Sequence, residues 1–169
     1  MKVVKDSMVL INLAKTTILE ISCDYFKKVM IARGVFEETV IVGKKKGMED
    51  AKLIEILVKN KKIEVKQVKD KNLLKMANEF NIYRGEAESL AIYNQEEANL
   101  LISDDYNLRK KKELVKAKII GSLAVILKLK LANKINKNKF IDVIEKMREV
   151  GWFSNAVLDK VLLESEKHG

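Results

Sequence analysis

Short apolar segments alternate with segments of helical periodicity along the whole chain, and this alternation limits the possible fold more than any other feature of the sequence. Residues 2–4 and 29–31 are β-type apolar runs, and after each of them apolar residues recur at helical spacing. The second of these helices is expected to run to Gly43. The alternation continues, with strands expected at 63–68, 98–102 and 118–120 and helices at 51–58, 70–80, 86–93, 107–116, 123–131, 137–149 and 155–167. Because parallel strands need a crossover connection, usually a helix, the pattern predicts an α/β fold with a mostly parallel central sheet covered on both faces.

The length of the chain, 169 residues, is that of one domain. It contains no proline, and no linker or low-complexity segment divides it. We therefore expect a single three-layer α/β/α domain over residues 1–169, in which residues 135–169 form a helical C-terminal extension.

The rare residue types exclude several classes of protein. The single cysteine, Cys23, allows neither an intramolecular disulfide nor a zinc site built on cysteines. The single histidine, His168, is next to the C-terminus, so we exclude hydrolases and zinc sites that depend on a positioned imidazole. The glycines spell neither a P-loop nor a dinucleotide-binding motif. Apolar runs are shorter than the ~20 residues of a membrane span, and we expect a cytoplasmic protein with no membrane partner.

Acidic residues follow the predicted strands. Asp6 comes directly after the first strand, Asp104 and Asp105 after the strand that ends at residue 102, Glu86 opens a helix, and Glu38 lies on the helix after the second strand. Ligands of parallel α/β sheets bind where strands end and helices begin. Carboxylates gathered there repel one another unless a cation lies among them, and oxygen ligands favour Mg²⁺ or Mn²⁺. With a net charge of +9 to attract polyanions, the pattern indicates metal-assisted phosphodiester hydrolysis.

Each acid also has a structural interpretation. Asp6 and one of Asp104 and Asp105 are possible helix N-caps. Glu86 is placed where a first-turn acid stabilises the helix dipole, and Glu38 is placed where a solvated helix residue is common. Spacing alone does not choose between the two interpretations.

Motifs at these acids resemble the PIN-domain family, metal-dependent nucleases of bacteria and archaea that include many toxin components, and most closely a branch that carries G-E-A-E. The similar segments are residues 6–14 (DSMVLINLA), 31–38 (IARGVFEE), 85–91 (GEAESLA), 100–105 (LLISDD) and 119–124 (IIGSLA). The chain departs from the branch at Ala32, where a proline is usual, at Ala124, where a glycine is usual, and at Glu86, where relatives often have aspartate.

The resemblance implies a PIN-like α/β/α fold and a site of four catalytic acids. These acids are Asp6, Glu38, Glu86 and Asp105, with Asp6, Glu86, Asp104 and Asp105 as ligands of one or two Mg²⁺ or Mn²⁺ ions. The implied activity is hydrolysis of single-stranded RNA, rather than DNA, by in-line attack of water. An antitoxin partner and a homodimer through the apolar terminal helices are also implied.

Basic and hydroxyl residues near the acids are candidates for binding nucleic acid. Arg84, Arg109 and Lys110 are expected to hold the phosphate backbone, because such contacts give affinity without sequence choice. Ser7 and Ser122 are expected to orient a bound water or a phosphate. A lysine-rich helix face is, however, also typical of a solvated surface.

Trp152 and Phe153 precede the last expected helix. We interpret them as a hydrophobic contact that holds this helix, in preference to a platform on which bases stack.

Two other classes of function are considered. One is a binding module with the same fold that holds RNA or a protein without cleaving it. The other is a phosphoacceptor receiver domain, which also gathers acids at the end of an α/β sheet; it requires an acidic pair after the first strand, whereas Asp6 is followed by Ser7.

Overall fold

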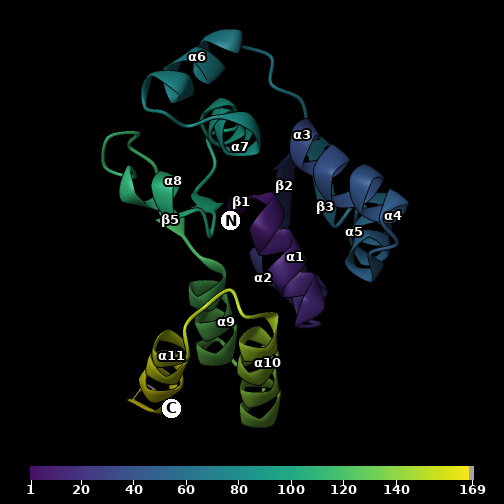
Figure 1. Ribbon diagram of the computed structural model, residues 1–169, viewed down its shortest axis with the longest axis vertical. Coiled ribbons are helices and arrows are strands. Elements are labelled where there is room, and N and C mark those ends of the chain that lie inside the picture. The colour runs from purple at the N-terminus through teal and green to yellow at the C-terminus, as the bar shows by residue number, and fades with distance from the viewer. Residues whose placement is uncertain (168–169) are drawn as a thin grey trace.

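The computed structural model describes residues 1–167 and contains a five-stranded parallel sheet (Figure 1). The strands are β1 (Lys2–Lys5), β2 (Lys28–Ala32), β3 (Ile63–Lys66), β4 (Leu100–Ile102) and β5 (Ile119–Ile120). Their order is β3-β2-β1-β4-β5, and all four neighbouring pairs are parallel. The predicted parallel sheet is confirmed. The order differs from the 2-1-3-4-5 order of receiver domains, so the receiver alternative is excluded.

The strand order reverses between β1 and β4. The chain moves outward from β1 through β2 to β3 and then returns, so that β4 pairs with the free side of β1 in the register Val4 to Leu101. The carboxyl ends of these two strands are therefore neighbours. Such a switch point is where ligands bind in open α/β sheets.

Helices cover both faces of the sheet, and three more pack together at one end of the molecule (Figure 1). Between the strands lie α1 (Ser7–Lys15), α2 (Leu19–Phe26), α3 (Arg33–Phe36), the π-helical η1 (Glu37–Val42), α4 (Gly43–Lys45), α5 (Glu49–Lys59), α6 (Lys71–Glu79), α7 (Arg84–Gln95) and α8 (Tyr106–Lys110). After β5 follow α9 (Ser122–Leu131), α10 (Lys137–Val150) and α11 (Asn155–Lys167). None of the helices within residues 1–167 is long and apolar enough to cross a membrane.

Three local predictions need correction. The chain forms α2, which the sequence analysis did not predict. The helix expected at 107–116 ends at Lys110 and continues as turns. The helix expected to end at Gly43 runs on to Lys45 and is π-helical in its middle, from Glu37 to Val42.

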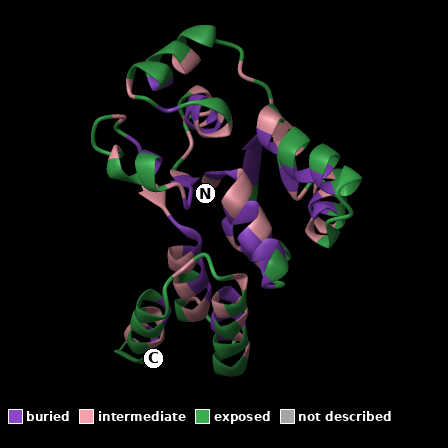
Figure 2. Cartoon of the chain, in the orientation of Figure 1, coloured by how far each residue is buried: buried purple, intermediate pink, exposed green. Residues whose placement is uncertain are grey.

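Buried residues lie along the sheet and on the helix faces that pack against it (Figure 2), and the fully buried residues include Lys5. Lys5, the last residue of β1, donates a hydrogen bond to the Ser22 hydroxyl, and its Nζ lies 5.7 Å from the centre of the Phe26 ring. Burial lowers the pKa of Lys5 below its ordinary value of 10.5, because the charged form loses its hydration. The folded state therefore bears a cost for this side chain at neutral pH.

The substitution Lys5→Met is expected to raise the free energy of unfolding by about 1–2 kcal/mol at pH 7, since it keeps the volume and removes the buried amine. The gain should shrink as the pH rises toward 10.5, where the unfolded chain also loses this proton. Urea denaturation of both proteins measures the difference. Lys5→Ala, which leaves a cavity, should be less stable than wild type. A Lys5→Met protein less stable than wild type would show that the contacts of the amine outweigh the cost of its burial.

Candidate functional site

Asp6 lies at the junction of β1 and β4 and is 4 % exposed. Its backbone N–H donates to the carbonyl oxygen of Ile102 at 3.1 Å, which extends the pairing of the two strands by one residue. One carboxylate oxygen caps α1 by accepting from the backbone N–H of Val9 at 2.9 Å, and the other accepts from the hydroxyl of Ser103. Asp6 is thus the N-cap of α1, which was one of its two interpretations from the sequence. It also lines the cavity described below.

Four acidic side chains line one cavity of about 210 Å³ at this junction. They are Asp6 after β1, Glu38 in η1, Glu86 in the first turn of α7 and Asp105 at the start of α8. These acids come from four separate segments of the sequence, and the strand order brings the segments together. The structure therefore places all four predicted catalytic acids around the same space.

The environment of the cavity disfavours the charged forms of two of these acids. Burial, reinforced by the nearby charges of Asp104 and Glu86, raises the pKa of Asp6 from 3.8 to about 7, although hydrogen bonds from Ser103 and Val9 oppose the shift. Burial also raises the pKa of Glu86, with further contributions from the charges of Asp105 and Glu38. A cation in the cavity would reverse this effect.

The donor set fits a hard divalent cation, because it consists of carboxylate oxygens whose mutual repulsion a cation relieves. Within residues 1–167, however, no three His, Cys, Asp or Glu side chains are already close enough together to hold a metal ion. The acids surround the cavity without forming a closed coordination shell. Ion binding would thus require their side chains to move inward.

Glu38 is held by a hydrogen bond from the neighbouring helix. The Ser7 hydroxyl, in the first turn of α1, donates to Glu38 Oε2 at 2.6 Å. Ser7 also lines the cavity, where it had been predicted to orient a water or a phosphate. Glu38 lies in the π-helical segment, and such segments occur frequently at functional sites.

Asp104 and Asp105 are adjacent in sequence and differ in environment. Asp105 caps α8, accepting from the backbone N–H of Leu108 at 2.6 Å, and lines the cavity. Asp104 is buried and does not line it: its oxygens accept from Asn12 Nδ2 at 3.0 Å and from the backbone N–H of Ser122 at 2.8 Å.

The residues predicted to bind nucleic acid also lie in different environments. Arg84 lines a second cavity that shares Glu86 and Asp105 with the first. Arg109 and Lys110 are exposed on α8 and line neither cavity. Ser122 is fully buried, and within the described part of the chain its hydroxyl has no hydrogen-bond partner.

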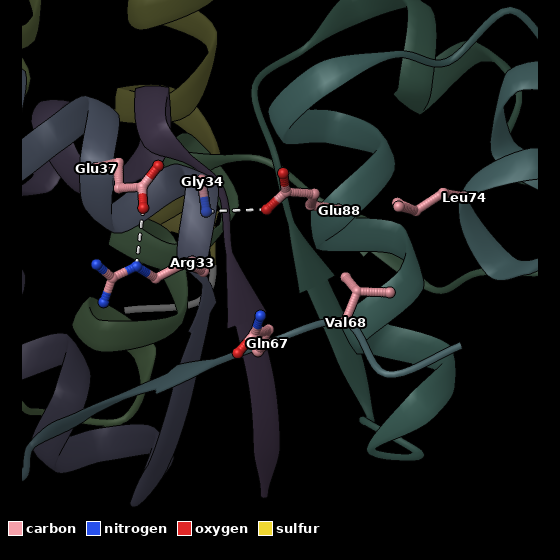
Figure 3. A pocket seen from close by; sticks show the side chains of 7 residues that line it. All are labelled: Arg33, Gly34, Glu37, Gln67, Val68, Leu74 and Glu88. Carbon is pink, nitrogen blue, oxygen red and sulfur yellow. Dashed lines mark hydrogen bonds and ion pairs between the residues drawn. The ribbon is translucent and has the colours of Figure 1, made fainter. Parts of the chain in front are cut away.

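Glu88 has a positioning role that the sequence analysis did not assign. Its carboxylate accepts from the backbone N–H of Gly34 at 2.9 Å and thereby joins α7 to α3, the helix that leads into η1 and Glu38 (Figure 3). A Cβ on Gly34 would lie 2.7 Å from this carboxylate, so a larger residue at this position would require the Glu88 side chain to shift. The G-E-A-E motif, with its second acid two residues after Glu86, was the available signal.

Ser103 and Trp152 also belong to this site: Ser103 was not predicted, and Trp152 was interpreted from the sequence as a hydrophobic contact for the last helix. Ser103 holds Asp6 and was visible only as the residue before the two aspartates. Trp152 lines the acidic cavity although it is distant in sequence from all four acids. His168 lies outside the described residues.

Because Asp6 is buried, we expect the free energy of unfolding to depend on pH. Because its pKa is higher in the folded chain than in the unfolded one, the folded state is disfavoured as the pH rises from about 4 to above 7. Asp6→Asn, which keeps the shape and the cap, is expected to raise the free energy of unfolding by about 1–4 kcal/mol at pH 8 without divalent ions, and to change it little at pH 4. Urea denaturation at the two pH values checks this, and an equal effect at both would contradict it.

The comparisons with known proteins agree with this geometry. A family model, DUF3368, described as a PIN domain, matches residues 2–167. No curated protein and no solved structure gives a significant match. A match over nearly the whole length, together with the parallel α/β/α fold, shows that the chain belongs to the PIN-domain family.

Proposed function

We propose that the protein is a metal-dependent ribonuclease of the cytoplasm that hydrolyses phosphodiester bonds of single-stranded RNA. The PIN domain is a nuclease fold, and the observation that carries the proposal is the cavity at the β1–β4 switch point lined by four carboxylates. Mg²⁺ or Mn²⁺ is the proposed cofactor, because carboxylate oxygens without histidine or cysteine suit hard divalent ions.

Asp6, Glu86 and Asp105 are the proposed ligands of the ion. When bound, a divalent ion activates water and neutralises charge that develops on the phosphate. Ser103 fixes the orientation of Asp6 through a hydrogen bond. The environments of the two adjacent aspartates favour Asp105 over Asp104 as a ligand, since both oxygens of Asp104 accept hydrogen bonds away from the cavity.

Glu38 is the proposed acceptor for the attacking water. Its side chain is exposed at the cavity and held by Ser7, so it can receive a hydrogen bond or a proton from a water inside the cavity. Glu88 fixes the helix that leads to Glu38 and is a positioning residue.

Positive charge supports a polyanionic substrate. The net charge of +9 favours association with RNA, and Arg84 lies beside Glu86 and Asp105 in the second cavity. Arg109 and Lys110, exposed on α8, are proposed to contact phosphates farther along the strand. Following the family resemblance, we also propose that the nuclease is a toxin component with an antitoxin partner and that it forms a homodimer.

A second candidate function is a PIN-like module that binds nucleic acid or protein without cleavage. The observation that favours it is the separation of the acids, which form no ready-made metal site within residues 1–167.

Incubation of the purified protein with single-stranded RNA distinguishes the two functions. Cleavage is expected with Mn²⁺ or Mg²⁺ and not with EDTA, and Asp6→Asn/Asp105→Asn should lower the rate at least about 100-fold by removing two ligand charges. The matched control Glu113→Gln/Glu149→Gln removes the same charge from exposed positions outside the cavity and should cleave at the wild-type rate. RNA binding without metal-dependent cleavage would favour the binding module.

A further inference from the structure

Exposed aromatic side chains gather around the acidic site. Within residues 1–167 three aromatic residues are exposed: Tyr83 (53 %), Tyr106 (77 %) and Trp152 (51 %). Tyr106 directly follows Asp105, and the other two line the cavities described above. Single exposed apolar side chains are ordinary, but a group of aromatic ones beside a candidate active site indicates a binding surface.

Trp152 faces the cavity while its neighbour anchors the chain. Gly151 ends α10 in the left-handed conformation, at φ 74°, and redirects the backbone. Phe153 then packs against the hydrophobic core, whereas Trp152 is half exposed and lines the same cavity as the four acids. The sequence interpretation of both aromatics as a hydrophobic contact therefore describes Phe153 and not Trp152.

Tyr83 lines the second cavity, beside Arg84. Its hydroxyl donates to Asn81 Oδ1 at 3.0 Å, and the carbonyl oxygen of Asn81 accepts from Asn107 Nδ2 at 2.8 Å, which ties this loop to α8. The Tyr83 side chain is therefore hydrogen-bonded to the loop before α7, and this loop is hydrogen-bonded to α8.

The two cavities share Glu86 and Asp105. Trp152 lines the first cavity and Tyr83 lines the second, so each of the two cavities that share these acids also has an exposed aromatic ring in its wall. Arg84 adds a cation to the second cavity, where its charge acts on Glu86. Aromatic rings combined with a cation are the usual means of holding an unpaired strand, because every base has a face that can stack.

We propose that Trp152 and Tyr83 stack on unpaired bases on the two sides of the phosphate that is cleaved, so that the site selects single-stranded nucleic acid. The selection arises because bases in a duplex are stacked on one another and cannot reach the two rings. The inference rests on the proposed nuclease function for the position of the cleaved phosphate, but the stacking itself is measurable without cleavage.

Trp152 is the single tryptophan of the chain, so its fluorescence reports on stacking directly. The wild-type protein is titrated in EDTA, which prevents metal-dependent cleavage, with a uridine octamer, an abasic strand of equal length and charge, and a blunt duplex. The uridine octamer is expected to quench the fluorescence, and the abasic strand and the duplex are expected to leave it nearly unchanged. Equal quenching by the uridine and abasic strands would contradict the proposal, because phosphates alone would then account for binding.

Steady-state cleavage of single-stranded RNA tests the two rings separately. Trp152→Leu and Tyr83→Leu should each raise KM roughly 5- to 150-fold with a smaller change in kcat, as expected for the loss of one base stack. Trp152→Phe and Tyr83→Phe, which keep a ring, should restore most of the affinity. Ile56→Ser is the control, since Ile56 on α5 is as exposed as Trp152 (51 %) and lines neither cavity.

The two experiments distinguish a failure of base stacking from a failure of the proposed nuclease function. An unchanged KM in both leucine variants would overturn the stacking and leave metal-dependent cleavage standing. Base-dependent quenching in a protein that never cleaves RNA would overturn the nuclease function and support stacking in a binding module.

Discussion

The parallel pairing of β1 with β4 is the contact on which the site depends. It places the residue after β1 next to the residues after β4, and the backbone hydrogen bond from Asp6 to Ile102 continues the pairing into the site. Ser103 then holds the Asp6 carboxylate from the β4 side. The first turns of α1, α7 and α8 begin around this junction, so their acidic and hydroxyl residues face a common space. If the two strands paired elsewhere, the four acids would remain isolated helix residues.

Buried ionisable groups at and beside the proposed site lower the stability of the folded chain. Lys5 and Asp6 are consecutive and both buried. Burial lowers the pKa of Lys5 and raises the pKa of Asp6, so in both cases it favours the uncharged form. No ion pair joins them within the described residues, where Lys5 contacts Ser22 and Asp6 contacts Ser103. A folded chain without a cation therefore carries carboxylates in an unfavourable environment. The divalent ion that we propose would recover part of this cost on binding.

Strand and helix periodicity was sufficient to predict the parallel α/β fold, because each apolar run and each helical stripe is a local property of the sequence. The positions of Asp6, Asp104 and Asp105 after strands marked these residues as candidates, whereas the choice of Glu38, Glu86 and Asp105 as catalytic acids came from the resemblance to the PIN-domain family. The orientation of Asp104 relative to Asp105 was not predictable, because it depends on Asn12 and on the backbone of Ser122, which only folding brings near. The different positions of Phe153, against the core, and Trp152, at the cavity, were also not predictable, because they depend on the left-handed turn at Gly151.

The proposed function depends most directly on a divalent ion bound by Asp6, Glu86 and Asp105 in this cavity. Anomalous diffraction from a crystal soaked in Mn²⁺ tests it most directly. We expect a manganese peak in the cavity, with oxygens of Asp6, Glu86 and Asp105 drawn inward to within bonding distance of it. A fully soaked crystal with no peak in this cavity, and with the carboxylates still apart, would contradict the account.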